Sequence, residues 1–330
     1  MTDREAVFLE KLARTGLWQL PGLLQALPDE TARLARLCYA ASPAGDWLDT
    51  PPEVFFSCAA HARYLRENVS WTRALPEPLF LAYVLHPRVN NEALCDCRPV
   101  FYAALAERLR GLPEEAAILE INRWCAEHVA YQPTDERTRS ALAVLRAGFG
   151  RCGEESMFAV NVLRACGFAA RQVYVPRWAH CDDNHAWVEV RCGGAWHFLG
   201  ACEPEAVLDR GWFNSAAGRA VLVHSRCFGE PEPDAEVIGR EGDVAYCNET
   251  ARYADVRRLT VRVTDENGMS AAGADVDFCI LNNCEWYPAA TVQTDASGMA
   301  ALTCGLGSLR LLARRDGLCC EAFVSPEETG

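Results

Sequence analysis

The chain has 330 residues, of which 50% are hydrophobic and 23% are charged, which is the composition of an ordinary globular protein. Its formal net charge of −13 argues against nucleic acid or an anionic membrane surface as a partner, because both attract clustered basic residues. The length is sufficient for two or three domains.

We expect no secretory leader, because Glu10, Lys11 and Arg14 interrupt the apolar residues that follow the first charged ones. No apolar stretch approaches the length of a membrane span. We therefore expect a cytoplasmic protein. The 17 cysteines are scattered and odd in number, so we expect most of them to pack as small hydrophobic side chains in a reducing compartment.

The sequence also predicts no metal and no cofactor. The close cysteine pairs, Cys95–Cys97 and Cys319–Cys320, lack the two-pair spacing of a structural zinc site. There is no dense carboxylate cluster at calcium-ligand spacing, and no glycine loop of the kind that binds phosphates or dinucleotides.

Apolar residues at helical spacing predict an α-helical N-terminal domain over residues 1–112. Within it, the polar cluster 88–92 fits either a turn held by side-chain hydrogen bonds or the lining of a cleft. A strong helix is predicted over 113–131, because Pro113 suits a first turn and acidic residues follow it. A second helix is predicted over roughly 140–147.

A third helix is predicted from Gly153 to Cys166, after which the pattern changes to short strands. A loop rich in proline, glycine and acidic residues is expected over 229–243. Alternating apolar residues then predict a small β-sandwich over 255–330. The expected fold class is α+β, with the N-terminal domain, a core over 113–250 and this sandwich. The strands expected in the core are 170–175, 186–192, 196–199 and 219–224.

Cys152 is the leading candidate for a nucleophile. It lies between Gly150 and Gly153 at the start of the third helix, where small neighbours let a carbonyl group approach the sulfur. Backbone N–H groups at a helix N-terminus can also hold an oxyanion. Because the helix N-terminus and a nearby imidazolium both favour thiolate, we expect the pKa of this thiol to be lowered.

His185 begins the strand after a polar run, which places an imidazole at the rim of the sheet. A lone histidine at such a position is more often a surface residue. Together with Cys152, however, it forms the pair that cysteine acyl-transfer chemistry needs, with His185 as the base. Tryptophans gather in the sequence around this pair, either as core aromatics or as the floor of a substrate groove: Trp178, Trp187, Trp196 and Trp212.

These segments resemble the core of the transglutaminase-like superfamily. The resemblance rests on Gly150-Arg151-Cys152-Gly153 before a helix, on Cys166-Gly167-Phe168-Ala169-Ala170-Arg171 at its end, and on the strand Asn184-His185-Ala186-Trp187-Val188-Glu189-Val190. It covers about residues 115–205 and implies a papain-like fold with a Cys-His-Asp triad. The flanking regions are similar to those of bacterial members with a helical N-terminal domain and a prealbumin-like or carboxypeptidase-regulatory-like sandwich.

The third member of the implied triad departs from the family pattern. The position that matches the aspartate is Gly200, and a carboxylate before proline follows three residues later as Glu203. The longer side chain of Glu203 could reach the same imidazole if the chain bulges there. Otherwise Glu203 is a solvated loop acid, with Asp182 and Asp183 as weaker substitutes.

The resemblance implies a cysteine peptidase or amidase in which Cys152 attacks a peptide or protein amide and His185 protonates the leaving amine. The Cys152 N–H would face the oxyanion, and Gln132 could add a donor. Two alternatives stay open: a transglutaminase that crosslinks proteins, and a non-catalytic scaffold or binding module with the same fold. The oligomeric state is not readable from the sequence.

Overall fold

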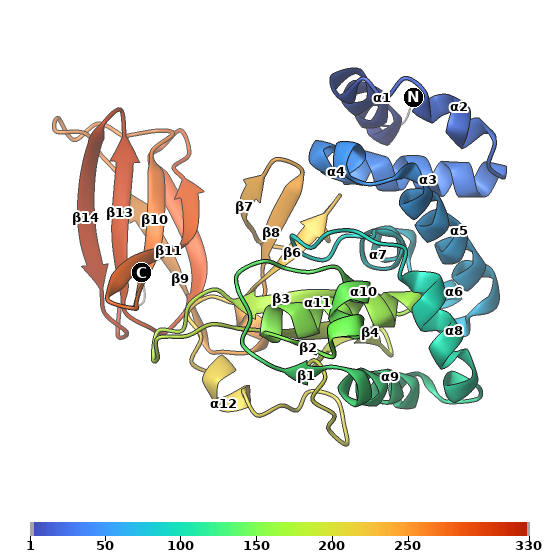
Figure 1. Ribbon diagram of the computed structural model, residues 1–330. Helices are drawn as coiled ribbons and strands as arrows, with labels where there is room; N and C mark the ends of the chain where they lie inside the picture. The colour runs from blue at the N-terminus through green and yellow to red at the C-terminus, as the bar shows by residue number, and fades with distance from the viewer. Residues whose placement is uncertain (1–2, 329–330) are drawn as a thin grey trace.

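The computed structural model describes residues 3–328, and the chain has the predicted α+β fold class (Figure 1). Helices make up the N-terminal region, and one further helix lies in the centre of the molecule. No helix within the described residues is both long and apolar enough to cross a membrane. The helices are α1 (Asp3–Thr15), α2 (Leu20–Gln25), α3 (Asp29–Ala41), α4 (Ala44–Asp49), α5 (Pro52–Asn68), α6 (Ser70–Ala74), α7 (Glu77–Phe80), the π-helical turn η1 (Leu81–Leu85), α8 (Arg98–Leu109), α9 (Glu114–His128), α10 (Ala141–Ala147), α11 (Cys152–Ala165), α12 (Asn214–Ala217) and the 3₁₀ turn η2 (Thr250–Arg252).

The strands form one central sheet, two C-terminal sheets and one short parallel pair. The central sheet is antiparallel, with the order β5-β4-β3-β6-β8-β7, and α11 packs against β3 and β4. The strands are β1 (Ala130–Tyr131), β2 (Phe149–Gly150), β3 (Ala170–Val175), β4 (His185–Cys192), β5 (Ala195–Leu199), β6 (His224–Phe228), β7 (Val237–Glu241), β8 (Val244–Asn248), β9 (Val256–Arg262), β10 (Asp275–Asn282), β11 (Glu285–Gln293), β12 (Met299–Gly305), β13 (Leu309–Arg315) and β14 (Leu318–Val324).

Helix α11 is the centre of the core, and residues 154–165 are buried along its whole length. Its first turn is held by Glu154, whose carboxylate accepts a hydrogen bond from the Arg151 backbone N–H and pairs with Arg139 at 2.8 Å. Its end is fixed by Gly167, which has a φ of 89°. A Cβ atom at Gly167 would lie 2.1 Å from Thr72 Oγ1, so a glycine is required there.

The N-terminal region supports the core directly. Phe101 and Leu105 of α8 pack with residues of α9 and α11 in one hydrophobic cluster. The polar cluster 88–92 is a turn held by side-chain hydrogen bonds, because the Glu92 carboxylate accepts the backbone N–H groups of Val89 and Asn90 at 2.8 and 2.7 Å. This turn also reaches the core sheet, since the Asn90 amide donates to Gln172 Oε1 at 2.6 Å.

A buried ion network ties β4 to its neighbours. The Arg171 guanidinium on β3 contacts the Glu189 carboxylate on β4 at 2.6 Å and the Glu249 carboxylate at 2.8 Å. The second oxygen of Glu189 accepts hydrogen bonds from Arg252 at 2.7 Å and from the Tyr253 hydroxyl at 2.6 Å. Because removing one partner of a buried ion pair is costly, this network holds the strand that carries His185.

The C-terminal residues form two sheets around a separate hydrophobic cluster. The larger sheet has the order β11-β10-β13-β14 and the smaller pairs β12 with β9, as the sandwich prediction requires. The sandwich also holds the loop before His185, because the Asn282 amide donates to the carbonyl groups of Trp178 and Cys181 at 2.9 and 2.8 Å.

Two expectations for residues 219–243 were wrong. The strand predicted over 219–224 begins only at His224, because Val221 and Leu222 pack into the core of the sandwich instead of pairing. The predicted loop 229–243 contains β7, which pairs with β8 through a hairpin at Gly242. The acidic and proline residues mark only the first half of this segment as irregular.

Candidate active site

Cys152 is the first residue of α11, as the sequence predicted, and its side chain is half-buried. The helix can begin here because residue 150 is a glycine. A Cβ atom at Gly150 would lie 2.9 Å from Glu154 Cβ. Hydrogen bonding from the backbone N–H groups of Ala186 and Gly153 reaches the thiol. Since Ala186 directly follows His185 on β4, the helix start and the strand start meet at the sulfur.

The His185 ring lies in an aromatic pocket and is 8% exposed. Its centroid is 4.8 Å from that of Trp212, 5.0 Å from that of Phe213 and 5.9 Å from that of Trp187. The ring nitrogen Nε2 is buried and has no hydrogen-bond partner among residues 3–328. A buried polar atom without a partner is costly, so this nitrogen has an unused capacity for one hydrogen bond.

The electrostatics of the pair differ from the expectation. Burial raises the pKa of the Cys152 thiol, although the two backbone N–H groups and Arg151 oppose that effect. Burial lowers the pKa of His185 to about 4, and the nearby Asp183 carboxylate opposes it. Both side chains are therefore neutral at pH 7, and the predicted lowering of the thiol pKa was wrong.

Glu203 folds back over Gly200, the position that matches the family's aspartate. Its backbone N–H donates to the Gly200 carbonyl at 3.3 Å, and the Asn122 amide donates to that same carbonyl at 2.9 Å. A Cβ atom built on Gly200 would lie 2.3 Å from Glu203 Oε2 and 3.0 Å from Glu203 Cβ. The Glu203 side chain thus occupies the space in which an aspartate at residue 200 would begin.

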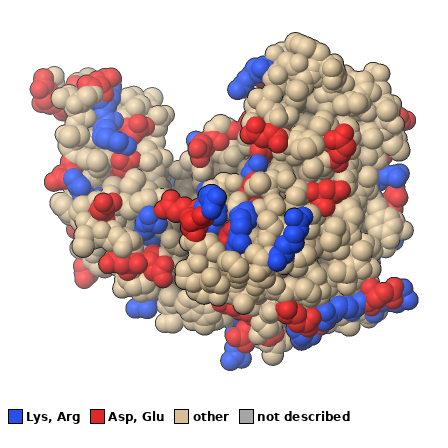
Figure 2. Space-filling model, viewed as in Figure 1, with Lys and Arg blue, Asp and Glu red and all other residues tan. Residues whose placement is uncertain are grey.

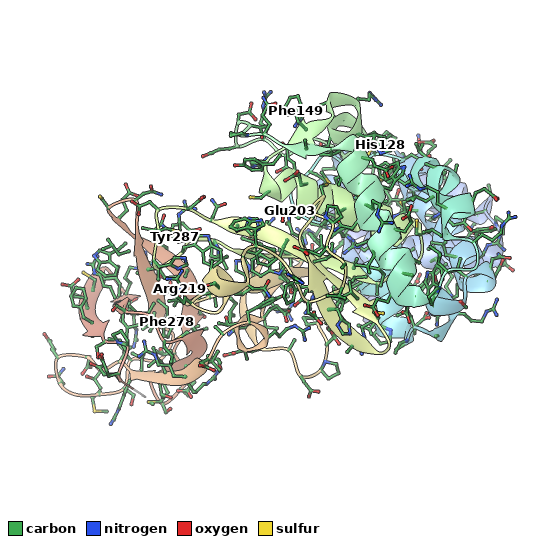
Figure 3. The ribbon with its side chains drawn as sticks, turned by 90° about the horizontal axis from the view of Figure 1, so that it is seen from below. His128, Phe149, Glu203, Arg219, Phe278 and Tyr287 are labelled. Carbon is green, nitrogen blue, oxygen red and sulfur yellow. The ribbon has the colours of Figure 1, made fainter. Side chains whose placement is uncertain are left out.

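Trp212 connects Glu203 to the His185 ring. The Trp212 indole N–H donates to both oxygens of the Glu203 carboxylate, at 2.9 and 3.0 Å, and the same indole packs against the His185 ring. Burial raises the pKa of Glu203, although the Trp212 hydrogen bond opposes the effect. Glu203 is labelled in Figure 3, and its side chain is only partly buried. Its predicted role in orienting His185 stays a prediction.

Gly200→Ala tests whether the position of Glu203 matters. The added methyl group must displace the Glu203 carboxylate and break its bonds to Trp212, because the contacts at 2.3 and 3.0 Å leave no room. We expect kcat on a peptide amide to fall by about 10- to 100-fold, in proportion to the loss of an orienting group. The variant Gly22→Ala, at an exposed position of α2 with no atom near the added methyl group, is the control and should keep its kcat. An unchanged kcat in Gly200→Ala would remove Glu203 from the site.

Glu155 is a site residue that the sequence prediction missed. It follows Cys152 by three positions on α11, is 4% exposed, and lies close enough to Glu203 for the two carboxyl groups to interact. Burial, with the Glu203 charge as a second cause, raises the pKa of Glu155 to about 8. The spacing of three residues along a helix, which places two side chains on one face, was the signal that could have found it.

The remaining predicted residues lie near the pair but have other contacts. Gln132 follows β1, and its backbone N–H donates to the Gly150 carbonyl at 2.9 Å. The Asp182 carboxylate accepts the backbone N–H of Asn283 at 2.7 Å, which ties the loop to the sandwich. Within residues 3–328, no group of three or more His, Cys, Asp or Glu side chains is placed to hold a metal ion.

The family comparison covers the part of the chain that carries the candidate site. Residues 103–201, which include Cys152 and His185, match the model of the transglutaminase-like superfamily. Among solved structures, the chain is similar to a "Putative Cysteine Protease from Cytophaga hutchinsonii" determined to 1.9 Å, with 16% identity, a TM-score of 0.34, and coverage of 56% of this chain and 68% of that chain. Among curated proteins, none matches.

The matched segment runs from within α8 to the residue after Gly200, and so contains α9, α11 and the strands β3, β4 and β5. The elements that carry Cys152 and His185 therefore lie within the matched segment. Residues 103–201 form a transglutaminase-like core, and the family resemblance inferred from the sequence is confirmed.

Proposed function

We propose that the protein is a cysteine peptidase or amidase in which Cys152 is the nucleophile and His185 is the base. The observation that carries the proposal is the contact between the Cys152 thiol and the backbone N–H beside His185, at the N-terminus of α11. This contact supports the pairing of the Cys152 sulfur with the imidazole of the residue before Ala186. The transglutaminase-like core supports a cysteine-based chemistry in general.

The neutral state of both groups fits this role. A neutral imidazole is the form that accepts a proton, so His185 takes the thiol proton as the Cys152 sulfur attacks the substrate carbonyl carbon. The C–S bond forms while the carbonyl electron pair moves onto oxygen. The tetrahedral intermediate then collapses, and His185 gives the proton to the leaving amine. Water next attacks the thioester, with His185 again as the base, and releases the acid.

The N-terminus of α11 supplies the oxyanion site. The first hydrogen bonds of the helix run from the backbone N–H groups of Glu154 and Glu155 to the Arg151 carbonyl, so the Cys152 N–H precedes them and is available to a substrate. A donor at this position stabilises the negative oxygen of the intermediate. Glu203 contributes by fixing Trp212, which packs on the imidazole.

The acyl acceptor distinguishes the proposal from its alternatives. The full-length protein is incubated with a casein-derived peptide mixture, with and without dansylcadaverine, and the products are read by mass spectrometry. Hydrolysis predicts new carboxyl or amino ends whose formation does not need the amine. Amine-dependent incorporation of dansylcadaverine would instead establish a crosslinking transglutaminase, and the absence of both reactions would favour a scaffold.

A further inference from the structure

A large cavity separates the central sheet from the C-terminal sandwich. Its volume is about 770 Å³, and its walls come from the end of β3, from β6, β7 and β8, and from β11. Figure 1 shows β7 and β8 beside β11, and Figure 2 shows this face of the molecule hollowed between the sandwich and the N-terminal helices, with basic side chains beside acidic ones. Aromatic side chains and one arginine line it: Tyr174, His224, Arg226, Tyr246 and Tyr287.

Arg226 is the most informative of these residues. Its guanidinium lies 5.5 Å from the ring centroid of Tyr174 and 5.6 Å from that of Tyr246. Among residues 3–328, its side-chain hydrogen bond runs from Nη2 to the Tyr174 hydroxyl at 3.1 Å, and its Nε is buried with no partner. A partly buried guanidinium in an acidic protein normally pairs with a carboxylate. Arg226 therefore has capacity for an anion.

The polar side chains near Arg226 leave its capacity to bind an anion unused. His224 is 5% exposed and its Nδ1 has no partner within residues 3–328. Burial, followed by the charge of Arg226, lowers the pKa of His224 to about 3, so this ring is neutral. The Glu241 carboxylate accepts the Tyr246 hydroxyl at 2.8 Å, and Asp275 accepts the Gln293 amide at 3.0 Å. The acidic groups around the cavity are thus bonded to other side chains.

Two strand edges also line the cavity. Strand β7 is the last strand of the central sheet and β11 is the first strand of the larger sandwich sheet. Residues 237–240 and 287–293 of these strands form opposite walls. Edge strands carry unpaired backbone groups, which favour an extended peptide over a compact ligand. Because Pro288 interrupts the donors of β11, we expect side-chain recognition to dominate over strand pairing.

One residue of the cavity wall, Tyr174, pairs with the strand that contacts the candidate nucleophile. Tyr174 pairs with His224 on one side and with Ala186 on the other, across β6, β3 and β4. The Ala186 backbone N–H is the group that reaches the Cys152 thiol. Tyr174 in the cavity wall therefore lies on the strand next to the one whose backbone reaches the sulfur.

We propose that this cavity binds an extended peptide through an acidic side chain, whose carboxylate pairs with Arg226 between the rings of Tyr174 and Tyr246. The inference rests on the proposed function in one respect, because it names an acidic peptide as the substrate of the Cys152 site. Arg240, which also lines the cavity, adds positive charge at its wall. We assign a carboxylate and not a phosphate as the group that Arg226 binds, because the long walls formed by β7 and β11 suit a polypeptide.

The test measures binding without turnover. Full-length Cys152→Ala protein is titrated into a fluorescein-labelled octapeptide of alternating Glu and Ala residues, and into the matched peptide with Gln in place of Glu, with fluorescence anisotropy as the readout. We expect the acidic peptide to bind about tenfold more tightly, and Arg226→Gln to remove that difference. Arg226→Lys, which keeps the charge, should keep a preference for the acidic peptide. Arg262→Gln, on the exposed surface of β9, should change nothing.

Equal binding of the two peptides, or an unchanged preference in Arg226→Gln, would overturn the inference. Displacement of the acidic peptide by an equal concentration of inorganic phosphate would do the same, because it would show a site for small anions. Two further outcomes distinguish a failure of this inference from a failure of the proposed function. If the wild-type protein cleaves peptides without preferring acidic ones, the inference fails alone. If the acidic peptide binds as expected but is never processed, the proposed function fails.

Discussion

Replacing Cys152 with alanine is expected to lower kcat/KM on a peptide amide by at least about 10⁴-fold. The reason is that no other group in the site can form the acyl intermediate. Glu155 is protonated at neutral pH, because its pKa is raised to about 8, and the neutral His185 imidazole acts on a proton. Initial rates of peptide cleavage by the wild type and the variant check this expectation.

The matched control for this variant is Cys181→Ala. Cys181 lies on the exposed loop before β4 and has no place in the proposed chemistry. Its removal should leave kcat/KM within about twofold of the wild type, the range of a surface substitution. Activity that survives Cys152→Ala, or that disappears with Cys181→Ala, would assign the nucleophile to a different cysteine.

Glu155→Gln is expected to stabilise the protein at alkaline pH. The folded state holds the Glu155 proton up to a pKa of about 8, whereas the unfolded chain releases it near the ordinary glutamate pKa of 4.5. Stability from this group is therefore full below pH 4.5 and is lost as the pH rises toward 8, the reverse of an ordinary carboxylate. Glutamine stays neutral, so the variant should gain roughly 4 kcal/mol over the wild type at pH 8 and almost nothing at pH 4.

Urea unfolding of both proteins at pH 4, 6 and 8 measures this difference directly. Glu136→Gln, at an exposed position of the loop before α10, controls for the loss of a charge and should show no such pH dependence. Glu154→Gln should show the opposite sign. Burial opposes the effect, but hydrogen bonds from Arg139 and Thr134 lower the pKa of Glu154 to about 2, so its stabilisation is present at pH 8. A Glu155→Gln stability that parallels the wild type at every pH would contradict the buried state of this carboxyl.

The sequence predicted the parts of the site that depend on local pattern. Glycines around Cys152 and the alternation after His185 are local signals, and they correctly indicated a helix start and a strand start. The strand over 170–175 was predicted with its observed bounds, because its apolar character and the glycine before it are also local. Short-range patterns of this kind are sufficient for element type.

The parts that depend on tertiary contacts were not predictable. Nothing local shows that the Glu203 side chain fills the space beside Gly200, because that requires the turn held by Asn122 of α9. The contact between Trp212 and His185 joins residues of separate segments in the same way. The direction of the Cys152 pKa was wrong for this reason as well, since the burial that dominates it comes from packing between elements and not from the helix N-terminus.

The most direct test of the central claim is selective labelling of the full-length protein by a peptidyl vinyl sulfone, mapped by mass spectrometry. The account predicts that Cys152, although half-buried, is modified before the exposed Cys181, Cys284, Cys319 and Cys320, and that His185→Ala abolishes this preference. Modification that follows exposure alone, or labelling of Cys152 that persists without His185, would contradict a nucleophile activated by that imidazole.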